Sequence, residues 1–324
     1  MLTFFISTIT NNYRIDNYLK GSLLSILLTL LPLSTHALAV VDDTGQIVNL
    51  SQPAKRIVSL APYLTELAFA AGAGNEILAV SAASNWPPQA AHLPRISDDR
   101  SIDFERLVKL KPDLILLWHS GTATVMRTRA QTLGIPIFFS DPHTFEEVAT
   151  TIERLGVLTN NIKTAQMKAN EVRHEANKLA YRYSKKSQVS VFYQVWSRPL
   201  MTLNGQHFIS NLIKLCGGEN IFSKSKISVP TVDIEAVVTA NPEVILTTKN
   251  NQHPPLDFST WQHLPQMTAT QKSAFIALDP DLLTRPTPRA LLATYQLCEM
   301  LERVRQTRAP EKNSISIRSS GHLK

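Results

Sequence analysis

The feature of this sequence that most restricts its fold is a repeated segment of sixteen residues. Residues 102–117 (IDFERLVKLKPDLILL) align without a gap on residues 232–247 (VDIEAVVTANPEVILT), and six of the sixteen positions are identical. In both copies an Asp precedes an apolar helical run, as an N-cap does, and a Pro precedes a short apolar run of the strand type. A helix followed by a strand, found twice at a spacing of 130 residues, predicts two related α/β lobes.

Short apolar runs and helical periods also alternate around both copies, which is typical of parallel sheets flanked by helices. In the first lobe we expect strands at 56–60, 77–80, 114–118 and 135–139 and helices at 65–71 and 103–110. In the second lobe we expect strands at 189–193, 244–248 and 275–278 and helices at 208–216 and 234–240. In paired lobes of this kind, ligands bind at the carboxyl ends of the strands, here between the lobes.

Between the lobes, residues 162–186 are rich in Ala, Lys, Glu and Gln and contain no Gly or Pro. They predict one long helix of about 33 Å. A coiled coil is the alternative, but no regular a/d repeat persists for three heptads. The predicted fold class is therefore α/β, with two lobes, each a central parallel sheet flanked by helices, joined by one long rigid helix.

The N-terminus has the pattern of a secretory signal peptide. Residues 21–33 form an apolar run too short to span a bilayer, and Ala37, Leu38 and Ala39 form a small-residue cleavage site, which makes Val40 the expected first mature residue. A buried N-terminal helix is the alternative. We divide the chain into a signal peptide (1–39), an N-terminal lobe (40–143), a helical connector (144–186), a C-terminal lobe (187–302) and a basic flexible tail (303–324).

The net charge of +7 is concentrated at the C-terminal end of the chain. Residues 303–324 carry a net charge of +5, whereas residues 40–302 carry only +1. A tail rich in Ser, Arg and Lys buries little surface, so we interpret it as a solvated end. With 44% apolar residues the remainder is a globular chain, and its balanced charge gives no reason to expect a nucleic-acid partner.

Cys216 and Cys298 are the only cysteines. An exported chain reaches an oxidising compartment, where one disulfide is the economical expectation. It would close a loop of 82 residues, which the loop-entropy estimate equates with about 4.5 kcal/mol. Two buried free thiols are the alternative.

Signatures of catalysis are missing from the sequence, which contains no GxSxG, no glycine-rich phosphate loop and no HExxH. We therefore expect no enzyme activity, no resident cofactor and no metal site. Instead, Trp86, Trp118 and Trp196 follow predicted strands, where broad flat side chains suit a large, partly apolar ligand. They could equally cap the cores of the lobes.

Two pairs of charged residues are further candidates. Asp281 and Arg285 lie in a Pro-punctuated loop after a predicted strand and could bind amide or hydroxyl groups, or form a plain surface ion pair. Glu105 and Glu235 occupy matching positions of the repeat, in the first turn of a helix. They either complement the helix dipole or dock, one per lobe, on a two-fold symmetric partner.

Several segments resemble the periplasmic binding proteins of vitamin B12 (cobalamin) import, within the helical-backbone superfamily of metal-chelate receptors. RIVSLAPYLTE at 56–66 and KPD at 111–113 are similar to segments shared with siderophore and haem receptors. CGGENIF at 216–222 and TPR at 287–289, together with Cys298, Asp281 and Arg285, point more narrowly to the cobalamin group. WPPQ at 86–89 belongs to the same set of markers.

The resemblance implies the class III architecture of periplasmic binding proteins, with cobalamin or a related corrinoid held between the lobes as the transported ligand. It implies ring contacts by Trp86 and Trp118, and corrin side-chain contacts by Asp281, Leu282, Leu283, Thr284 and Arg285; Trp196 is expected to supply a further aromatic surface. It also implies a Cys216–Cys298 disulfide.

By the same resemblance, Glu105 and Glu235 would dock on the dimeric permease of an ABC transporter. The expected protein is a periplasmic receptor, monomeric when free, that is not an enzyme. A haem or ferric-siderophore receptor of the same fold is the alternative.

Overall fold

The alternation of strands and helices after residue 56 builds two parallel sheets. The computed structural model describes residues 38–98, 100–249 and 258–308. In the N-terminal lobe the strands lie in the order β5-β4-β3-β6-β7, all parallel. Their bounds are β3 Ile57–Ser59, β4 Ile77–Ser81, β5 Arg95–Ser97, β6 Leu114–Trp118 and β7 Ile137–Ser140. The helices of this lobe are α2 Pro62–Ala70, α3 Phe104–Lys109 and α4 Thr124–Gln131.

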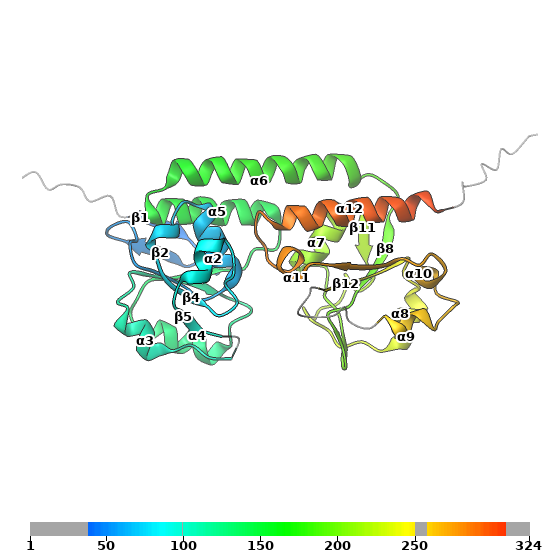
Figure 1. The fold of residues 1–324 in the computed structure, drawn as a ribbon, viewed down its shortest axis with the longest axis horizontal. Helices are drawn as coiled ribbons and strands as arrows, with labels where there is room; N and C mark the ends of the chain where they lie inside the picture. Colours follow the sequence, from blue (N-terminus) through cyan, green and yellow to red (C-terminus); the bar gives the residue numbers. More distant parts are fainter. Residues whose placement is uncertain (1–37, 99, 250–257, 309–324) are drawn as a thin grey trace, which may run out of the picture. The chain divides into compact units, whose positions relative to one another are not determined.

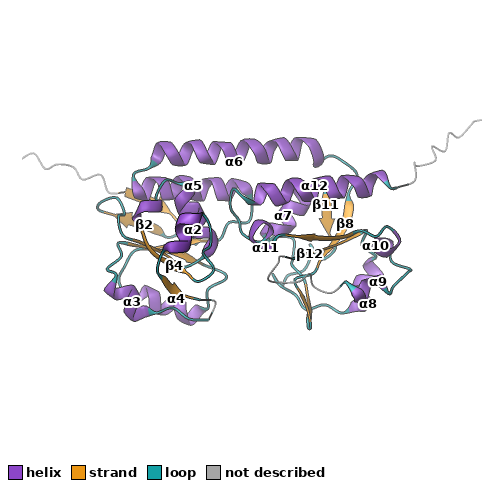
Figure 2. Cartoon of the chain, viewed as in Figure 1, coloured by secondary structure: helices purple, strands orange, loops and turns teal. Residues whose placement is uncertain are grey.

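The C-terminal lobe repeats this arrangement with the parallel strand order β11-β8-β12-β13. These strands are β8 Val189–Tyr193, β11 Gly218–Asn220, β12 Val244–Thr248 and β13 Phe275–Leu278. Its helices are α7 Phe208–Leu215, α8 Ile234–Ala240, α9 Ser259–Gln262, α10 Thr268–Gln271, α11 Pro280–Leu283 and α12 Ala290–Gln306. The predicted α/β fold class of two lobes, each built on a parallel sheet, is confirmed (Figure 2).

The structure also contains two small antiparallel hairpins that the sequence patterns did not reveal. β1 Leu38–Val41 pairs with β2 Ile47–Leu50, and β9 Trp196–Ser197 pairs with β10 Leu200–Met201. The expected cleavage before Val40 falls inside β1, while residues 1–37 of the predicted signal peptide lie outside the described residues.

The repeat in the sequence is a repeat in structure. The Oδ1 atom of Asp103 accepts a hydrogen bond from the backbone N–H of Arg106 at 2.9 Å, and that of Asp233 accepts from Ala236 at 2.7 Å. Both predicted N-caps are therefore confirmed. Beyond each helix the matching residues Lys111 and Asn241 take left-handed backbone angles, with φ of 47° and 44°. The shared turn geometry supports the interpretation of the lobes as duplicates.

One long helix, α6 Ile162–Tyr183, runs along both lobes (Figure 1). It is the predicted long helix and is preceded by α5 Phe145–Thr159. α6 lies along α5 and α12 (Figure 1). It buries one face through residues three and four apart, namely Ala165, Ala169, Val172, Ala176, Leu179 and Tyr183. A Cβ atom at Gly156 of α5 would lie 2.3 Å from that of Ala165, so the close approach of α5 to α6 needs this glycine.

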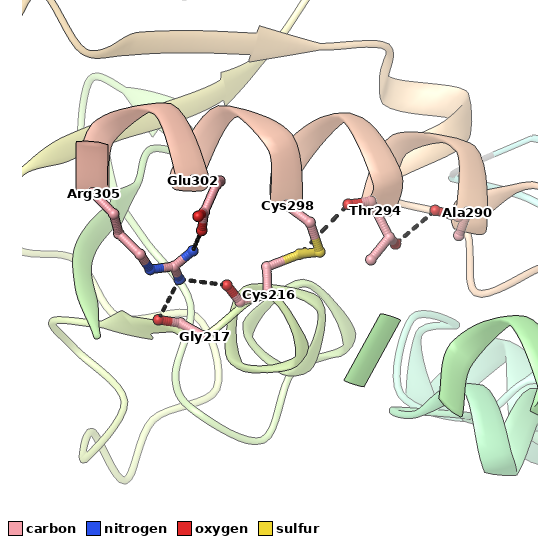
Figure 3. The surroundings of a disulfide bond; sticks show 7 residues. All are labelled: Cys216, Gly217, Ala290, Thr294, Cys298, Glu302 and Arg305. Carbon is pink, nitrogen blue, oxygen red and sulfur yellow. Dashed lines mark hydrogen bonds and ion pairs between the residues drawn. A yellow bond between two sulfur atoms is a disulfide. The ribbon is translucent and has the colours of Figure 1, made fainter. Parts of the chain in front are cut away.

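The disulfide between Cys216 and Cys298 is confirmed, with 4.6 Å between the Cα atoms. Cys216 caps the C-terminal end of α7, and Cys298 lies midway along α12. Both side chains are completely buried, and the bond between them is drawn in Figure 3. The bond therefore fastens α12 to the core of the C-terminal lobe.

The folded chain extends beyond residue 302, so the first residues of the predicted flexible tail, 303–308, are part of the folded structure. α12 continues to Gln306, and the Nη2 atom of Arg305 donates to the carbonyl oxygens of Cys216 and Gly217 at 2.6 and 2.9 Å (Figure 3). Arg308 pairs with Glu243 at 2.6 Å. These arginines are held because their guanidinium groups satisfy buried carbonyls and a carboxylate, which a composition argument does not register. Residues 309–324 lie outside the described residues.

The start of α7 carries a histidine whose protonation opposes folding. The Nδ1 atom of His207, the N-cap residue, accepts from the backbone N–H of Ile209 at 3.3 Å. Burial lowers the pKa of His207 to about 4, helped by His143 and opposed by Asp141. Because the unfolded chain protonates this residue near pH 6.5, its contribution to stability should be complete above that pH, be lost as the pH falls from 6.5 to about 4, and change no further below 4.

We expect a variant with His207→Asn to remove this pH dependence, because Asn also serves as an N-cap but does not titrate. Between pH 7 and pH 4 the wild-type protein should lose about 2 kcal/mol more free energy of unfolding than the variant, once residual solvent contact is allowed for. Urea unfolding followed by circular dichroism at each pH measures the difference. Parallel pH profiles for the two proteins would contradict the prediction.

Candidate functional site

A hollow of 340 Å³ lies at the carboxyl ends of the N-terminal strands. Its lining comes from the ends of β3, β4, β5 and β6 and from the loops that follow them. Trp118, the last residue of β6, forms part of this lining and is 38% exposed. This edge of a parallel sheet is where α/β folds bind ligands.

Trp118 is fixed in direction by three neighbours. Its Nε1 atom donates to Oδ1 of Asp141 at 3.0 Å, and its ring meets that of Tyr63 edge to face, with 5.9 Å between centroids. A Cβ atom at Gly121 would lie 2.1 Å from the indole, so only glycine leaves room for the ring. The arrangement presents one face of a rigid aromatic ring to the hollow.

A chain of buried hydroxyl groups anchors the loop after β4. The Oγ1 atom of Thr65 donates to Oγ of Ser59 at 2.9 Å and lies 3.0 Å from Oγ of Ser84, which lies 2.8 Å from Oγ of Ser81. All four residues are buried. The loop therefore leaves the sheet in one direction and places Asn85 and Trp86 next to the C-terminal lobe.

Arg285 is bonded across the boundary between the lobes. Its Nη1 atom donates to Oε1 of Glu66 at 3.0 Å and to Oδ1 of Asn85 at 2.7 Å, and its Nη2 atom donates to the carbonyl oxygen of Ala83 at 3.2 Å. The same Nη2 atom binds Oδ1 of Asp281 at 2.7 Å. The two predicted binding residues thus contact each other and the opposite lobe, and only 11% of the Arg285 side chain is exposed.

Glu66, on α2, is the buried acid at the centre of this contact. Its Oε1 atom also accepts from Nη1 of Arg289 at 3.1 Å, and the residue is only 4% exposed. Burial raises the pKa of Glu66, although Arg289 and Arg285 act to lower it. The cost of removing the ionised carboxylate from water therefore outweighs its attraction to the two arginines.

Trp86 is placed beside a different hollow from Trp118. The guanidinium carbon of Arg289 lies 4.3 Å from the centroid of the Trp86 ring, a cation–π contact. Both residues line a hollow of 590 Å³ that also touches Glu66 and Lys168 of α6. Trp86 and Trp118, the two predicted ring-contacting residues, thus line different hollows, and their contacts with a ligand stay a prediction.

Trp196 is the most exposed of the three candidate tryptophans, at 56%. It begins the β9–β10 hairpin, and its Nε1 atom donates to the carbonyl oxygen of Arg198 at 3.1 Å. Its ring is therefore free on the surface of the C-terminal lobe to meet a ligand.

The segment from Asp281 to Arg285 differs in part from its prediction. It is not a loop throughout, because α11 spans Pro280–Leu283, capped by Asp279. Leu283 is completely buried in the core, so its expected ligand contact is wrong for this conformation; the helical turn directs it inward. Leu282 is partly buried against the core, and Thr284 is exposed.

Glu105 and Glu235 lie on the solvent side of α3 and α8, at equivalent places in the two lobes. Both side chains are exposed. Glu105 forms an ion pair with Lys109 at 2.6 Å, although both side chains remain more than 70% exposed. An exposed pair of this kind contributes little to stability, so the carboxylate stays available to a partner.

Sequence reasoning missed Glu66, Asn85 and Arg289 as members of the site. Glu66 and Arg289 belong to the segments RIVSLAPYLTE and TPR, which resemble those of metal-chelate receptors, and this resemblance is the only signal in the sequence that could have found them. In the part of the chain that the structure describes, no three His, Cys, Asp or Glu side chains are grouped to hold a metal ion. No helix in those same ranges combines the length and the apolar character needed to cross a membrane.

Comparison with known proteins places this architecture in a family. The model of the family described as periplasmic binding protein matches residues 57–282. A vitamin B12-binding protein of Vibrio parahaemolyticus is 33% identical over 258 residues, which are 80% of this chain and 93% of the relative. The chain belongs to the family of periplasmic vitamin B12-binding proteins.

Two further relatives agree with this membership. A vitamin B12-binding protein of Vibrio cholerae is 38% identical over 77% of this chain and 90% of its own length. The crystal structure of the periplasmic vitamin B12-binding protein BtuF of Vibrio cholerae matches with a TM-score of 0.73 at 37% identity, covering 79% of this chain and 99% of that chain. The periplasmic haem-binding protein HutB of Vibrio cholerae, at 21% identity and a TM-score of 0.65, shares the fold.

Proposed function

We propose that this protein captures cobalamin, or a related corrinoid, in the periplasm and delivers it to an ABC transporter. The observation that carries the proposal is the similarity to vitamin B12-binding relatives along nine-tenths or more of their length. Trp118 on the N-terminal lobe and Trp196 on the C-terminal lobe supply exposed indole surfaces for a broad ring. A receptor needs to bind and release its ligand and has no covalent chemistry to perform.

We place the corrinoid at the carboxyl ends of the strands, between the lobes, with the face of Trp118 against it. In the ion pair between Asp281 and Arg285, Asp281 is the more exposed partner, with 31% of its side chain accessible. It accepts hydrogen bonds from both Arg285 and Asn85 and retains lone pairs for a donor on the ligand. The primary amides that surround a corrin ring are donors of this kind.

Calorimetric titration of the protein, purified from the periplasm of an expressing strain, tests the proposal. We expect cyanocobalamin to bind with one-to-one stoichiometry and a Kd below about 1 μM. Hemin serves as the competitor ligand, because the fold is shared with haem-binding proteins. Binding of hemin without cyanocobalamin would overturn the corrinoid assignment and leave a receptor of the same fold.

Purification from the periplasm also tests the proposed export. The N-terminus of the recovered protein should begin at Val40 if the signal peptide is cleaved after Ala39. N-terminal sequencing determines this directly. An intact N-terminus would remove the support for a cleaved signal peptide.

Docking on the permease is proposed to use Glu105 and Glu235, one from each lobe. We expect the double variant Glu105→Ala, Glu235→Ala to lower transporter-dependent uptake by tenfold or more (about 1.4 kcal/mol), because cationic groups of the permease would then be buried in the interface without carboxylate partners. Its affinity for cyanocobalamin should remain that of the wild type, since neither residue lines the hollow beside Trp118 or the hollow beside Trp86.

A matched control replaces two other exposed acids, Glu171 on α6 and Glu219 on β11. That variant removes the same net charge and should support normal uptake. Uptake is measured with radiolabelled cobalamin in vesicles that contain the transporter. Equal losses in both double variants would point to net charge, not to docking at these positions.

A further inference from the structure

Glu66 differs from the other candidate residues because its cationic partners come from the opposite lobe. It lies on α2 of the N-terminal lobe, while Arg285 and Arg289 precede α12 in the C-terminal lobe. One oxygen atom, Oε1, accepts from both guanidinium groups, at 3.0 and 3.1 Å. A single buried carboxylate therefore links the lobes through two ion pairs.

The link continues from Glu66 to the exposed part of the site. Arg285 joins Glu66 to Asp281, and Asn85 closes the contact by donating from Nδ2 to Oδ2 of Asp281 at 2.8 Å. Glu66 offers little surface to a large ligand, since it is only 4% accessible. Its effect on binding is therefore expected to pass through the two arginines that it holds, Arg285 and Arg289.

Stability alone does not account for a charge at this position. Burial raises the pKa of Glu66 even with Arg285, Arg289 and Thr287 beside it, so the ionised form is disfavoured by its surroundings. Replacing a whole buried ion pair by apolar residues of similar volume is often neutral or stabilising, so the pair by itself is weak evidence for a role in stability. The charge on Glu66 instead fixes the orientation of the two arginine side chains, because both guanidinium groups pair with the same atom, Oε1.

We infer that Glu66 is a positioning residue of the ligand site: by holding Arg285 and Arg289 across the lobe boundary, it keeps the lobes and the Asp281 carboxylate in the binding arrangement before the ligand arrives. The inference rests on the proposed function in so far as the ligand is a corrinoid. We call the two ion pairs of Glu66 with Arg285 and Arg289 the latch.

The test is the isosteric variant Glu66→Gln, studied by stopped-flow binding of cyanocobalamin. Without the latch, only a fraction of molecules is competent to bind, and the apparent affinity falls by that fraction. We expect the association rate constant to fall about tenfold, with the dissociation rate constant unchanged, because the bound ligand itself orders the site. The melting temperature shows whether the variant is folded, because removing the carboxylate leaves the guanidinium groups of Arg285 and Arg289 without their shared partner.

Glu76→Gln is the matched control, because Glu76 pairs with Lys55 at 3.1 Å inside one lobe. It should bind at the wild-type rate. A wild-type association rate in Glu66→Gln would overturn the inference, and so would a change confined to the dissociation rate, which indicates direct ligand contact. If Glu66→Gln does not fold, Arg289→Met removes one of the two ion pairs, and an unchanged association rate in that variant overturns the inference equally.

A second measurement needs no ligand and separates this inference from the proposed function. Spin labels at Val125→Cys on α4 and Thr239→Cys on α8, both exposed positions, report the distance between the lobes. We expect one narrow distance distribution in the otherwise wild-type protein and a broader one with Glu66→Gln. Identical distributions would overturn the latch, whereas failure of the wild-type protein to bind cyanocobalamin would overturn only the proposed function.

Discussion

Replacing Cys216 and Cys298 with alanine is expected to lower the free energy of unfolding by about 4 kcal/mol. The disulfide closes a loop of 82 residues, and the entropy that it removes from the unfolded chain corresponds to about 4.5 kcal/mol. Alanine is the appropriate replacement because both side chains are completely buried and serine would add polar groups to the core. Urea unfolding of the double variant and of the oxidised wild type measures the difference.

Loss of the disulfide should loosen the C-terminal helix α12 most, because the bond joins this helix to the end of α7. α12 is held to the lobe by the disulfide and by Arg305, whose hydrogen bonds to Cys216 and Gly217 remain in the variant. Hydrogen exchange should therefore increase most in α12 and at the end of α7. Wild-type protein treated with a reductant should match the alanine variant, and a loss below about 1 kcal/mol would contradict the loop-entropy argument.

Replacing Trp118 with alanine should weaken binding of cyanocobalamin by at least 100-fold, about 2.7 kcal/mol. The indole is held by Asp141 and Tyr63 in a fixed direction, so a ligand stacked on it loses little entropy in ordering the side chain. Its removal takes away a rigid aromatic face at the edge of the N-terminal sheet. Calorimetric titration of the variant checks the prediction.

Tyr181 provides the matched control for an aromatic deletion. It lies on α6 and is 91% exposed, so Tyr181→Ala should bind as the wild type does. The melting temperature of each variant shows whether the fold is retained. Unchanged affinity in a folded Trp118→Ala variant would exclude the hollow beside this residue from the ligand site.

Much of the architecture could be predicted from patterns along the chain. The repeat of 102–117 in 232–247 encodes a local unit, an N-cap, a helix and a strand, and local hydrogen bonds are specified by neighbouring residues. The long helix over Ile162–Tyr183 follows in the same way from helix-forming residues with an apolar face. The short strand β5 and the hairpin β9–β10 were not predicted, because strands of two or three residues are too short to show a hydrophobic period in the sequence.

The candidate site was predictable in kind and only partly in detail. Tryptophans at the ends of strands were visible in the sequence, and all three of them, Trp86, Trp118 and Trp196, are exposed, while their contacts with a ligand stay a prediction. The inward direction of Leu283 was not visible, because it depends on the helical turn of α11 and on the core beneath it.

Sequence alone thus determines the two related lobes, the connecting helix and the resemblance to cobalamin receptors, because each of these is written in contiguous segments. Only the tertiary structure decides which side chains of one lobe meet those of the other. Glu66 lies 219 residues from Arg285 in the chain, and no local pattern relates them. Their ion pair exists because α2 and the segment before α12 are brought together by the packing of both lobes along α5 and α6.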